Sequence, residues 1–235
     1  MKILALETSA VTASVAVTED EALLAQSFQN SGLTHSATLM PMAANLLENT
    51  GLKLDEIDVI AVAAGPGSFT GVRIGVAAAK GLAWPGDKLC APCSTLKSMA
   101  WQCAHMEGEI CAVMDARRKQ VYNARFVGKD GVITRITEDR AIAVEDLVAE
   151  VKASGVPQIL VGDGARLCHE AFEAAGVVSV IMPPHLQYQT AWGVAREALE
   201  LARENKLVPA GQMTPEYHRL SQAERERLER ETGNK

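Results

Sequence analysis

The sequence predicts an α/β protein made of two similar lobes, each a mixed sheet flanked by helices. Three short strands are followed by alternating strands and helices, and this order occurs twice along the chain. The composition, with 48% hydrophobic and 22% charged residues, is that of a globular protein and excludes a disordered, collagen-like or coiled-coil chain. The 235 residues suffice for two small lobes with a proper core. The halves share no clear sequence identity, so the duplication is one of topology.

The first lobe is expected to span residues 1–104. Short, closely spaced strands at its start indicate an antiparallel meander. A helix follows, with Leu39, Ala43 and Leu46 on one stripe, and then a strand that is apolar on both faces and should be central in its sheet. The expected elements are strands over 2–8, 13–18, 22–28 and 57–63, and helices over 35–48, 72–84 and 94–104.

The second lobe is expected to span residues 105–211, and a charged tail to span 212–235. Thr190 is a candidate N-cap for the last helix, and the sequence leaves open on which lobe this helix packs. Opposite charges at helical spacing in the tail are typical of a solvated helix end or a frayed tail. The expected elements of the lobe are strands over 110–114, 120–127, 132–138, 158–161 and 178–181, and helices over 144–153, 166–175 and 190–205.

Charge and cysteine content limit the possible partners and compartments. A net charge of −6 argues against a protein that binds nucleic acid by itself, since such proteins are normally basic. No run of 18 apolar residues predicts a membrane span, and Glu7 interrupts the apolar N-terminal run too early for a signal peptide. Five cysteines, an odd number, favour reduced thiols and therefore a cytoplasmic protein without membrane contact.

A glycine-rich turn lies between the apolar strand and the next helix. It matches neither the P-loop nor the dinucleotide-binding pattern, because Val72 and Arg73 follow its last glycine, which also comes one residue late. Two interpretations stay open: a tight strand-to-helix turn, or an anion site at the start of the helix. The turn consists of Gly65, Pro66, Gly67, Ser68, Phe69, Thr70 and Gly71.

The helix after this turn carries few charges and many small residues. Arg73 and Lys80 are its charged residues, and glycine or alanine recurs every fourth position. Such a stripe allows another helix to approach closely, and the helix over 35–48 is also apolar beyond one stripe. The hypothesis is a helix-on-helix interface with a partner subunit; the alternative is a pair of ordinary core helices. The residues expected at the interface are His35, Leu39, Met40, Ala43, Gly71, Arg73, Gly75, Ala79, Lys80 and Ala83.

Several motifs of the sequence resemble those of the TsaB (YeaZ) family, and together they extend over nearly the whole chain. The run from Gly65 to Gly71 with Val72-Arg73-Ile74-Gly75 is the most specific of them. The others are weaker alone but occur in the right order: Lys2 to Ser9, His35-Ser36 with Leu39 and Pro41, Asp115 to Arg118 with Val121-Tyr122, Gly162 to Ala165, and Pro215 to Arg219 with Ala223-Glu224.

The resemblance implies a two-lobed actin/Hsp70/sugar-kinase-like (ASKHA) fold and a role in making threonylcarbamoyladenosine beside the tRNA anticodon. It implies a non-catalytic partner subunit of the transferase TsaD, with the ATPase TsaE as third component and a homodimer when alone. The tRNA would then be contacted mainly through the transferase. An independent ATPase or kinase-like enzyme is the alternative, and a glycoprotease-type peptidase is a weaker one.

The resemblance also places a degenerate nucleotide cleft between the lobes. Glu7 stands where the family usually has Asp, and the hairpin after Asp115 has no glycine to cradle a phosphate. The cleft residues are Glu7, Thr8, Asp115, Arg117, Gly162, Asp163 and Gly164. We therefore expect no cofactor of its own, although a nucleotide at the junction with the transferase stays open.

Three further features have a structural and a functional interpretation. Arg117, Arg118 and Lys119 could contact a phosphate or tRNA, or form a solvated hairpin tip. Cys90 and Cys93 have the spacing of a redox pair or half a zinc site, but buried small residues are favoured. The five histidines include no pair at i, i+4, so we expect no metal site.

Overall fold

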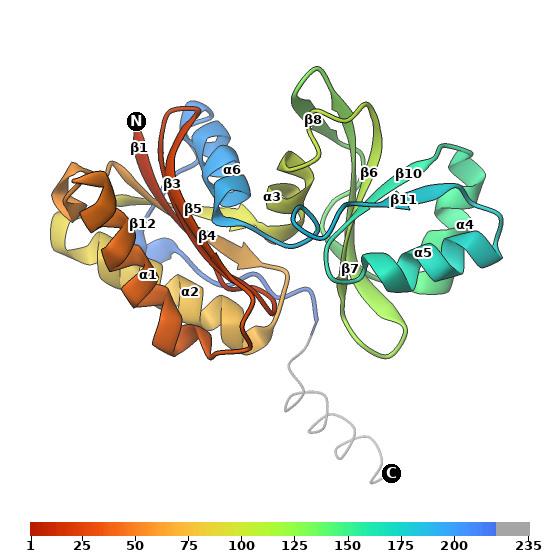
Figure 1. Cartoon of the computed structure of the whole chain (residues 1–235), viewed down its shortest axis with the longest axis horizontal. Coiled ribbons are helices and arrows are strands. Elements are labelled where there is room, and N and C mark those ends of the chain that lie inside the picture. The colour runs from red at the N-terminus through yellow and green to blue at the C-terminus, as the bar shows by residue number, and fades with distance from the viewer. Residues whose placement is uncertain (220–235) are drawn as a thin grey trace, which may run out of the picture.

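The computed structural model describes residues 1–219 and contains two six-stranded sheets side by side (Figure 1). The first sheet has the order β12-β5-β4-β1-β2-β3, and the second has the order β11-β10-β6-β7-β8 with β9 also paired to β7. The strands of the first sheet are β1 (Lys2–Glu7), β2 (Ala13–Glu19), β3 (Ala22–Gln29), β4 (Val59–Gly65), β5 (Leu89–Ser94) and β12 (Val208–Pro209). Those of the second are β6 (Gly108–Asp115), β7 (Gln120–Lys129), β8 (Val132–Arg135), β9 (Arg140–Ala143), β10 (Gln158–Val161) and β11 (Ser179–Ile181).

The two sheets repeat one topology. In each, a first strand pairs antiparallel with the next strand, and on its other side pairs parallel with a strand that follows a helix. The predicted α/β fold class of two mixed-sheet lobes is therefore confirmed. The helices are α1 (His35–Thr50), α2 (Phe69–Ala83), α3 (Thr95–Trp101), α4 (Val144–Ser154), α5 (Ala165–Ala174) and α6 (Ala191–Arg203), with short 3-10 helices at Leu54–Glu56, Trp84–Gly86 and Ala210–Gln212.

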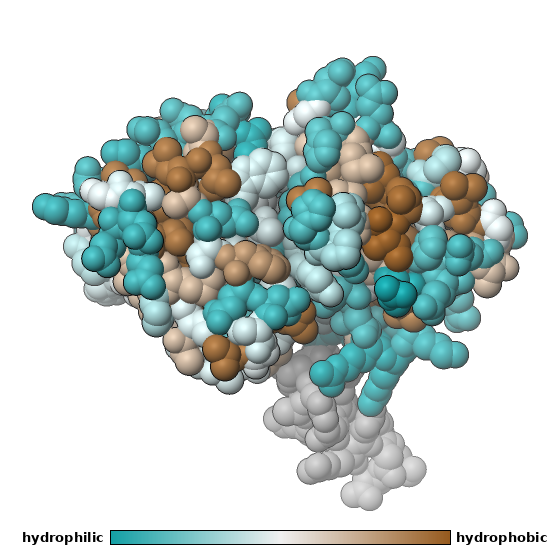
Figure 2. All heavy atoms as spheres, in the orientation of Figure 1, coloured by the Kyte–Doolittle hydropathy of each residue, from teal (hydrophilic) through white to brown (hydrophobic). Residues whose placement is uncertain are grey.

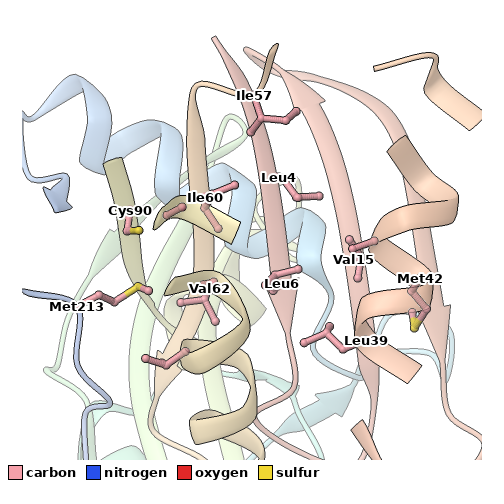
Figure 3. Packing of buried hydrophobic residues seen from close by; sticks show 14 of the residues in the cluster. Leu4, Leu6, Val15, Leu39, Met42, Ile57, Ile60, Val62, Cys90 and Met213 are labelled. Carbon is pink, nitrogen blue, oxygen red and sulfur yellow. The ribbon is translucent and has the colours of Figure 1, made fainter. Parts of the chain in front are cut away.

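Strand alternation divides the first lobe into two hydrophobic layers. Leu4, Leu6 and Val62 point toward α1 and α2, as Figure 3 shows, and belong to one buried cluster. Ile3 and Ala61, one position away on the same strands, pack instead against α6. The last helix therefore returns to the first lobe, which settles the point that the sequence left open.

The second lobe is also covered on both faces. Phe172 of α5 and Leu147 of α4 pack with Cys111 and Val113 on one face of the sheet. Met99 of α3 packs with residues of the other face. Because α3 also contacts α6, which covers the first sheet, it forms the packed junction between the lobes.

The small-residue stripe of α2 faces the protein's own sheet. A Cβ on Gly71 would lie 2.1 Å from the Thr8 carbonyl oxygen, and one on Gly75 would lie 2.6 Å from Thr8 Oγ1. Ala79 and Ala83 are fully buried in the core cluster. The expectation that this stripe meets a partner helix is therefore wrong. The residues are small because α2 lies close to β1.

Some element boundaries differ from those expected. Helix α2 begins at Phe69, three residues early, because Ser68 Oγ accepts a hydrogen bond from Gly71 N and caps the helix. The strand expected over 132–138 is instead β8 followed by β9. Between them, the backbone amides of Ile136 and Thr137 both bond the Arg125 carbonyl, so the chain turns before it pairs again with β7.

No helix in residues 1–219 is both long and apolar enough to cross a membrane. The charged tail expected over 212–235 falls partly outside the described residues. Its first part, through Arg219, runs from the first lobe to the junction between the lobes. Residues 225–230, which carry opposite charges at helical spacing, lie beyond the described range.

Two glycines of α2 provide a matched test of its packing. Gly71→Ala should lower the free energy of unfolding by about 1–3 kcal/mol, because its Cβ would collide with backbone. Gly81→Ala should raise it by up to about 1 kcal/mol, because no atom lies within 4 Å of the added Cβ and alanine favours helix. Urea unfolding of both variants measures the difference, and effects of the same sign would contradict this packing.

Candidate functional site

The exposed sides of α1 and α2 form a face with few charges. We call it the outer face; its residues are Ala37, Met40, Pro41 and Ala44 of α1 and Arg73, Ala77 and Gly81 of α2. Tan, brown and white spheres, with some teal ones among them, cover the lower part of the first lobe in Figure 2, where Figure 1 places these helices. Met40 is 43% exposed although it is a large apolar residue.

Charge is scarce on both helices. Glu48, in the last turn, is the one Asp, Glu, Lys or Arg of α1, and α2 has Arg73 and Lys80. The solvent side of a surface helix normally carries many charged residues. The low charge of the outer face is instead typical of a surface that a partner covers.

Part of the predicted interface lies on the outer face and part does not. Met40 and Arg73 are exposed there, while His35 and Lys80 are half-buried. Leu39 and Ala43 face the chain's own core, like the glycines and alanines of the α2 stripe. The predicted interface does not include Ala37, Pro41, Ala77 and Gly81, while Ala44 was part of the apolar surface expected on the helix over 35–48. The sequence pattern that could have indicated these residues is the lack of charged residues at the helix positions next to the predicted stripe.

The glycine-rich turn contacts protein backbone on several sides. Ser68 N donates to the Ser9 carbonyl at 2.6 Å, and a Cβ on Gly67 would lie 2.4 Å from the same oxygen. A Cβ on Gly65 would lie 2.2 Å from the Glu216 carbonyl oxygen. The glycines therefore leave room for the backbone that follows β1 and for the C-terminal segment rather than for a ligand, and the tight-turn interpretation is favoured.

The C-terminal segment, residues 213–219, crosses from the first lobe to the second. Glu216 N donates to the Ala64 carbonyl at 2.8 Å, beside the glycine-rich turn. The Tyr217 ring stacks on Phe69 with centroids 4.7 Å apart. The Arg219 guanidinium then donates to the carbonyl of Ala116 in the second lobe. The segment thus fastens the two lobes together at the end where α2 begins.

Arg73 joins this segment to the outer face. Its guanidinium carbon lies 3.8 Å from the Phe69 ring centroid, and its Nε donates to the Tyr217 hydroxyl at 2.8 Å. These contacts fix a long side chain that would otherwise move freely in solvent. The C-terminal segment therefore determines the orientation of Arg73, the charged residue near the start of α2.

A cleft of about 370 Å³ lies between the lobes, but Glu7 and Thr8 are not among the residues that line it. The Glu7 carboxylate is fully buried and accepts a hydrogen bond from Ser9 N at 2.5 Å. Burial raises its pKa to about 7, although the bonds from Ser9 oppose the shift. The Thr8 hydroxyl donates to the Gly71 carbonyl at 2.8 Å. Glu7 and Thr8 therefore hold the backbone around the glycine-rich turn in place.

The acidic residues of the second lobe accept bonds from nearby backbone. Asp163 Oδ1 accepts from Asp115 N at 3.1 Å, and burial raises the pKa of Asp163. Asp115 Oδ1 accepts from Arg117 N at 2.6 Å. Gly162 and Gly164 allow this turn to approach β6, since a Cβ on Gly162 would lie 2.0 Å from the Val113 carbonyl oxygen.

Asp115, Arg117 and Asp163 of the second lobe line the cleft, but the first-lobe residues that line it include no acid to complete a site for the magnesium nucleotide that the fold would bind there. Glu7 is buried away from the cleft, and the C-terminal segment contributes Glu216, Tyr217, His218 and Arg219 to the lining. Within residues 1–219, no three His, Cys, Asp or Glu side chains form a metal-binding cluster.

The tip of the β6–β7 hairpin has an unusual backbone. Arg117, Arg118 and Lys119 have φ angles of 63°, 55° and 58°, in the left-handed region. Each such residue costs of order 1 kcal/mol unless it is glycine. All three side chains are exposed.

The two cysteines of β5 cannot act as a pair. Cys90 packs in the cluster beneath α1 and α2, while Cys93 packs in the cluster beneath α6, on the other face of the sheet. Both are free and buried, and burial raises the pKa of each thiol. This placement supports the interpretation of both as buried small residues.

Comparison with known proteins gives two kinds of similarity. The family model for tRNA N6-adenosine threonylcarbamoyltransferase (TsaD) matches residues 29–226. The chain is 30% identical over 229 residues to "tRNA threonylcarbamoyladenosine biosynthesis protein TsaB" of Bacillus subtilis, covering 97% of this chain and 99% of that one. It is also 30% identical to the protein of that name in Escherichia coli, covering 93% and 95%.

Solved structures agree with the fold. YeaZ from Pseudomonas aeruginosa superposes with a TM-score of 0.79 at 25% identity, covering 92% of this chain and 99% of that one. A second Pseudomonas aeruginosa structure, described as similar to peptidase YeaZ, gives a TM-score of 0.80 at 24% identity, covering 93% and 99%. The expected family resemblance is therefore confirmed.

The buried carboxyl of Glu7 predicts a pH effect on stability. Because its pKa in the folded protein lies above the unfolded value, the folded state binds more protons between about pH 4.5 and 7. Its contribution to stability is therefore greatest below about pH 4.5 and is lost as the pH rises through 7. Glu7→Gln should flatten this decline, as measured by urea unfolding from pH 5 to 8. Parallel pH profiles for the two proteins would contradict the assignment.

The left-handed hairpin tip predicts a stabilising substitution. Lys119→Gly should raise the free energy of unfolding by about 1 kcal/mol, because glycine adopts a positive φ without strain. Lys129→Gly, in a strand of the same lobe, should instead lower it. Thermal or urea unfolding compares the pair; destabilisation by Lys119→Gly would refute the strained geometry.

Proposed function

The chain belongs to the TsaB family of tRNA threonylcarbamoyladenosine biosynthesis proteins, and on this premise we propose that it binds and activates a TsaD-like transferase as a non-catalytic subunit. The role in threonylcarbamoyladenosine biosynthesis comes with the family. The finer role rests on one observation, the outer face, which is exposed and almost without charge.

The outer face suits a partner that presents helices of its own. Ala37 and Ala44 on α1 and Ala77 and Gly81 on α2 have little or no side chain, so another helix can approach closely and gain packing contacts. The match to the transferase family model indicates that a TsaD-like partner has a related fold. Because the two folds are related, the helices of the transferase that correspond to α1 and α2 would pack against the outer face.

The cleft supports a subunit without its own catalytic site. Autonomous nucleotide chemistry in this fold would need acidic residues of both lobes to face the cleft. Asp115 and Asp163 of the second lobe line it, but Glu7 of the first lobe is fully buried and does not. A nucleophile of the peptidase kind would need an adjacent base, and none of the contacts of Ser68 provides one. Independent ATPase and peptidase activities are thus the less favoured alternatives.

Activation would act through a shift in the transferase population rather than through chemistry. A rigid outer face stabilises whichever transferase conformation fits it, in proportion to the difference in binding free energy. The bonds of Arg73 to the C-terminal segment make the start of α2 part of such a rigid surface. A TsaE-like ATPase, a nucleotide shared at the junction and a homodimer of the isolated chain stay predictions.

A charge placed on the outer face tests the proposal. Ala77→Glu should weaken binding to the transferase at least about tenfold, because a longer, charged side chain would have to be buried where alanine leaves room for a partner helix. The variant should fold normally, since Ala77 is exposed. Sedimentation velocity with increasing transferase measures the affinity, and tRNA modification by the mixture should fall in parallel.

The matched control is Ala153→Glu, an exposed alanine on α4 of the second lobe. It adds the same charge away from the outer face and should leave both binding and modification unchanged. Equal binding by the wild-type and Ala77→Glu proteins would refute the outer face as the interface. Nucleotide turnover by the isolated chain would instead support the independent enzyme.

A further inference from the structure

We propose that the tip of the β6–β7 hairpin, residues 116–119, is a contact for the phosphate backbone of RNA. This inference rests on the proposed function, since the RNA would be the tRNA bound to the transferase in its complex with this chain. The outer face, through which the transferase would bind, takes no part in this contact. The hairpin is an additional surface on the second lobe, at the end of the molecule where α2 begins (Figure 1).

The tip presents three cations in succession. Strands β6 and β7 pair up to Asp115 and Val121, so Arg117, Arg118 and Lys119 project beyond the sheet. All three side chains are exposed, and Figure 2 shows hydrophilic side chains extending from this edge of the second lobe. In the described part of the chain, none of them forms an ion pair.

The backbone of the tip is held in place on every side. Arg117 N donates to Asp115 Oδ1 at 2.6 Å, and Gln120 N donates to the Arg117 carbonyl at 3.1 Å. The Lys119 carbonyl accepts from Val144 N at 3.0 Å, and the Ala116 carbonyl accepts from the Arg219 guanidinium. These bonds maintain three consecutive left-handed residues, a conformation that glycine would adopt at lower cost.

The chemistry of the tip favours phosphodiesters over other anions. Arg118 and Lys119 are exposed and do not line the cleft between the lobes, whereas Arg117 does. The three cations therefore do not converge on one small anion. Exposed arginine and lysine side chains match phosphate contacts, which position a nucleic acid without reading its bases. Nearby acids are engaged locally: Asp115 bonds Arg117 N, and Asp163 bonds Asp115 N.

A local cationic tip is compatible with a net charge of −6. An acidic protein does not bind RNA strongly by itself, but a few placed cations can add to the affinity of a complex whose partner makes most contacts. The fixed backbone lowers the entropy that such a contact would cost. The hairpin is therefore a secondary phosphate contact, and it does not replace the transferase as the main RNA-binding surface.

The test is a salt titration of tRNA binding by the double variant Arg118→Ala with Lys119→Ala. Fluorescence anisotropy of labelled tRNA is measured from 50 to 200 mM salt, with the chain alone and with the transferase. The double variant should bind severalfold more weakly in the complex, and its log–log salt slope should be shallower by about 1 to 2. Arg118→Lys should retain the wild-type slope, because it keeps the charge.

The matched control is Lys129→Ala with Lys152→Ala, which removes two exposed lysines away from the hairpin tip. It should leave the slope unchanged. An unaltered affinity and slope for the hairpin variant would overturn the inference, as would weaker transferase binding at unchanged tRNA affinity, which would make the tip a protein contact. Sedimentation of the wild-type pair tests the proposed function separately. If no complex forms, the proposed function fails; if the complex forms but its tRNA affinity and salt slope are the same with the hairpin variant, the inference alone fails.

Discussion

The close approach of backbone to backbone around the glycine-rich turn is the constraint on which the rest of the structure depends. Gly65, Gly67 and Gly71 each lie where a Cβ would overlap a carbonyl oxygen of another segment. These contacts bring together the end of β1, the start of α2 and the C-terminal segment. With no room for side chains at these points, three distant parts of the sequence form one rigid corner of the first lobe.

The rigid corner connects the interior of the lobe to its surface. Inside it, Glu7 is fully buried, and burial favours the neutral acid although the Ser9 N–H bond to one carboxylate oxygen opposes this. Outside it, Arg73 contacts the Phe69 ring and donates to the Tyr217 hydroxyl, and Arg219 reaches the second lobe. The same packing thus leaves no open acidic site in the first lobe and fixes the start of the outer face. A subunit that acts by shape rather than by catalysis has these two properties.

Much of the fold could be predicted from the sequence, because strand alternation and helix periodicity report directly which residues face a core. The site was harder to predict. Periodicity placed Gly71, Gly75, Ala79 and Ala83 on one face of α2, but it could not tell whether that face met a sheet or a partner. The contact of Arg73 with Tyr217 joins residues 144 apart, and no local pattern marks it. The positive φ values of the hairpin tip could not be predicted either, because arginine and lysine rarely adopt them.

The central claim is that this chain supports threonylcarbamoyl transfer without performing it. The most direct test is reconstitution of tRNA modification from purified TsaD-like transferase and TsaE-like ATPase, with and without this chain, measuring threonylcarbamoyladenosine formed. We predict that modification requires the chain, and that the chain alone forms no product. Full modification by the transferase and ATPase without the chain would contradict the account.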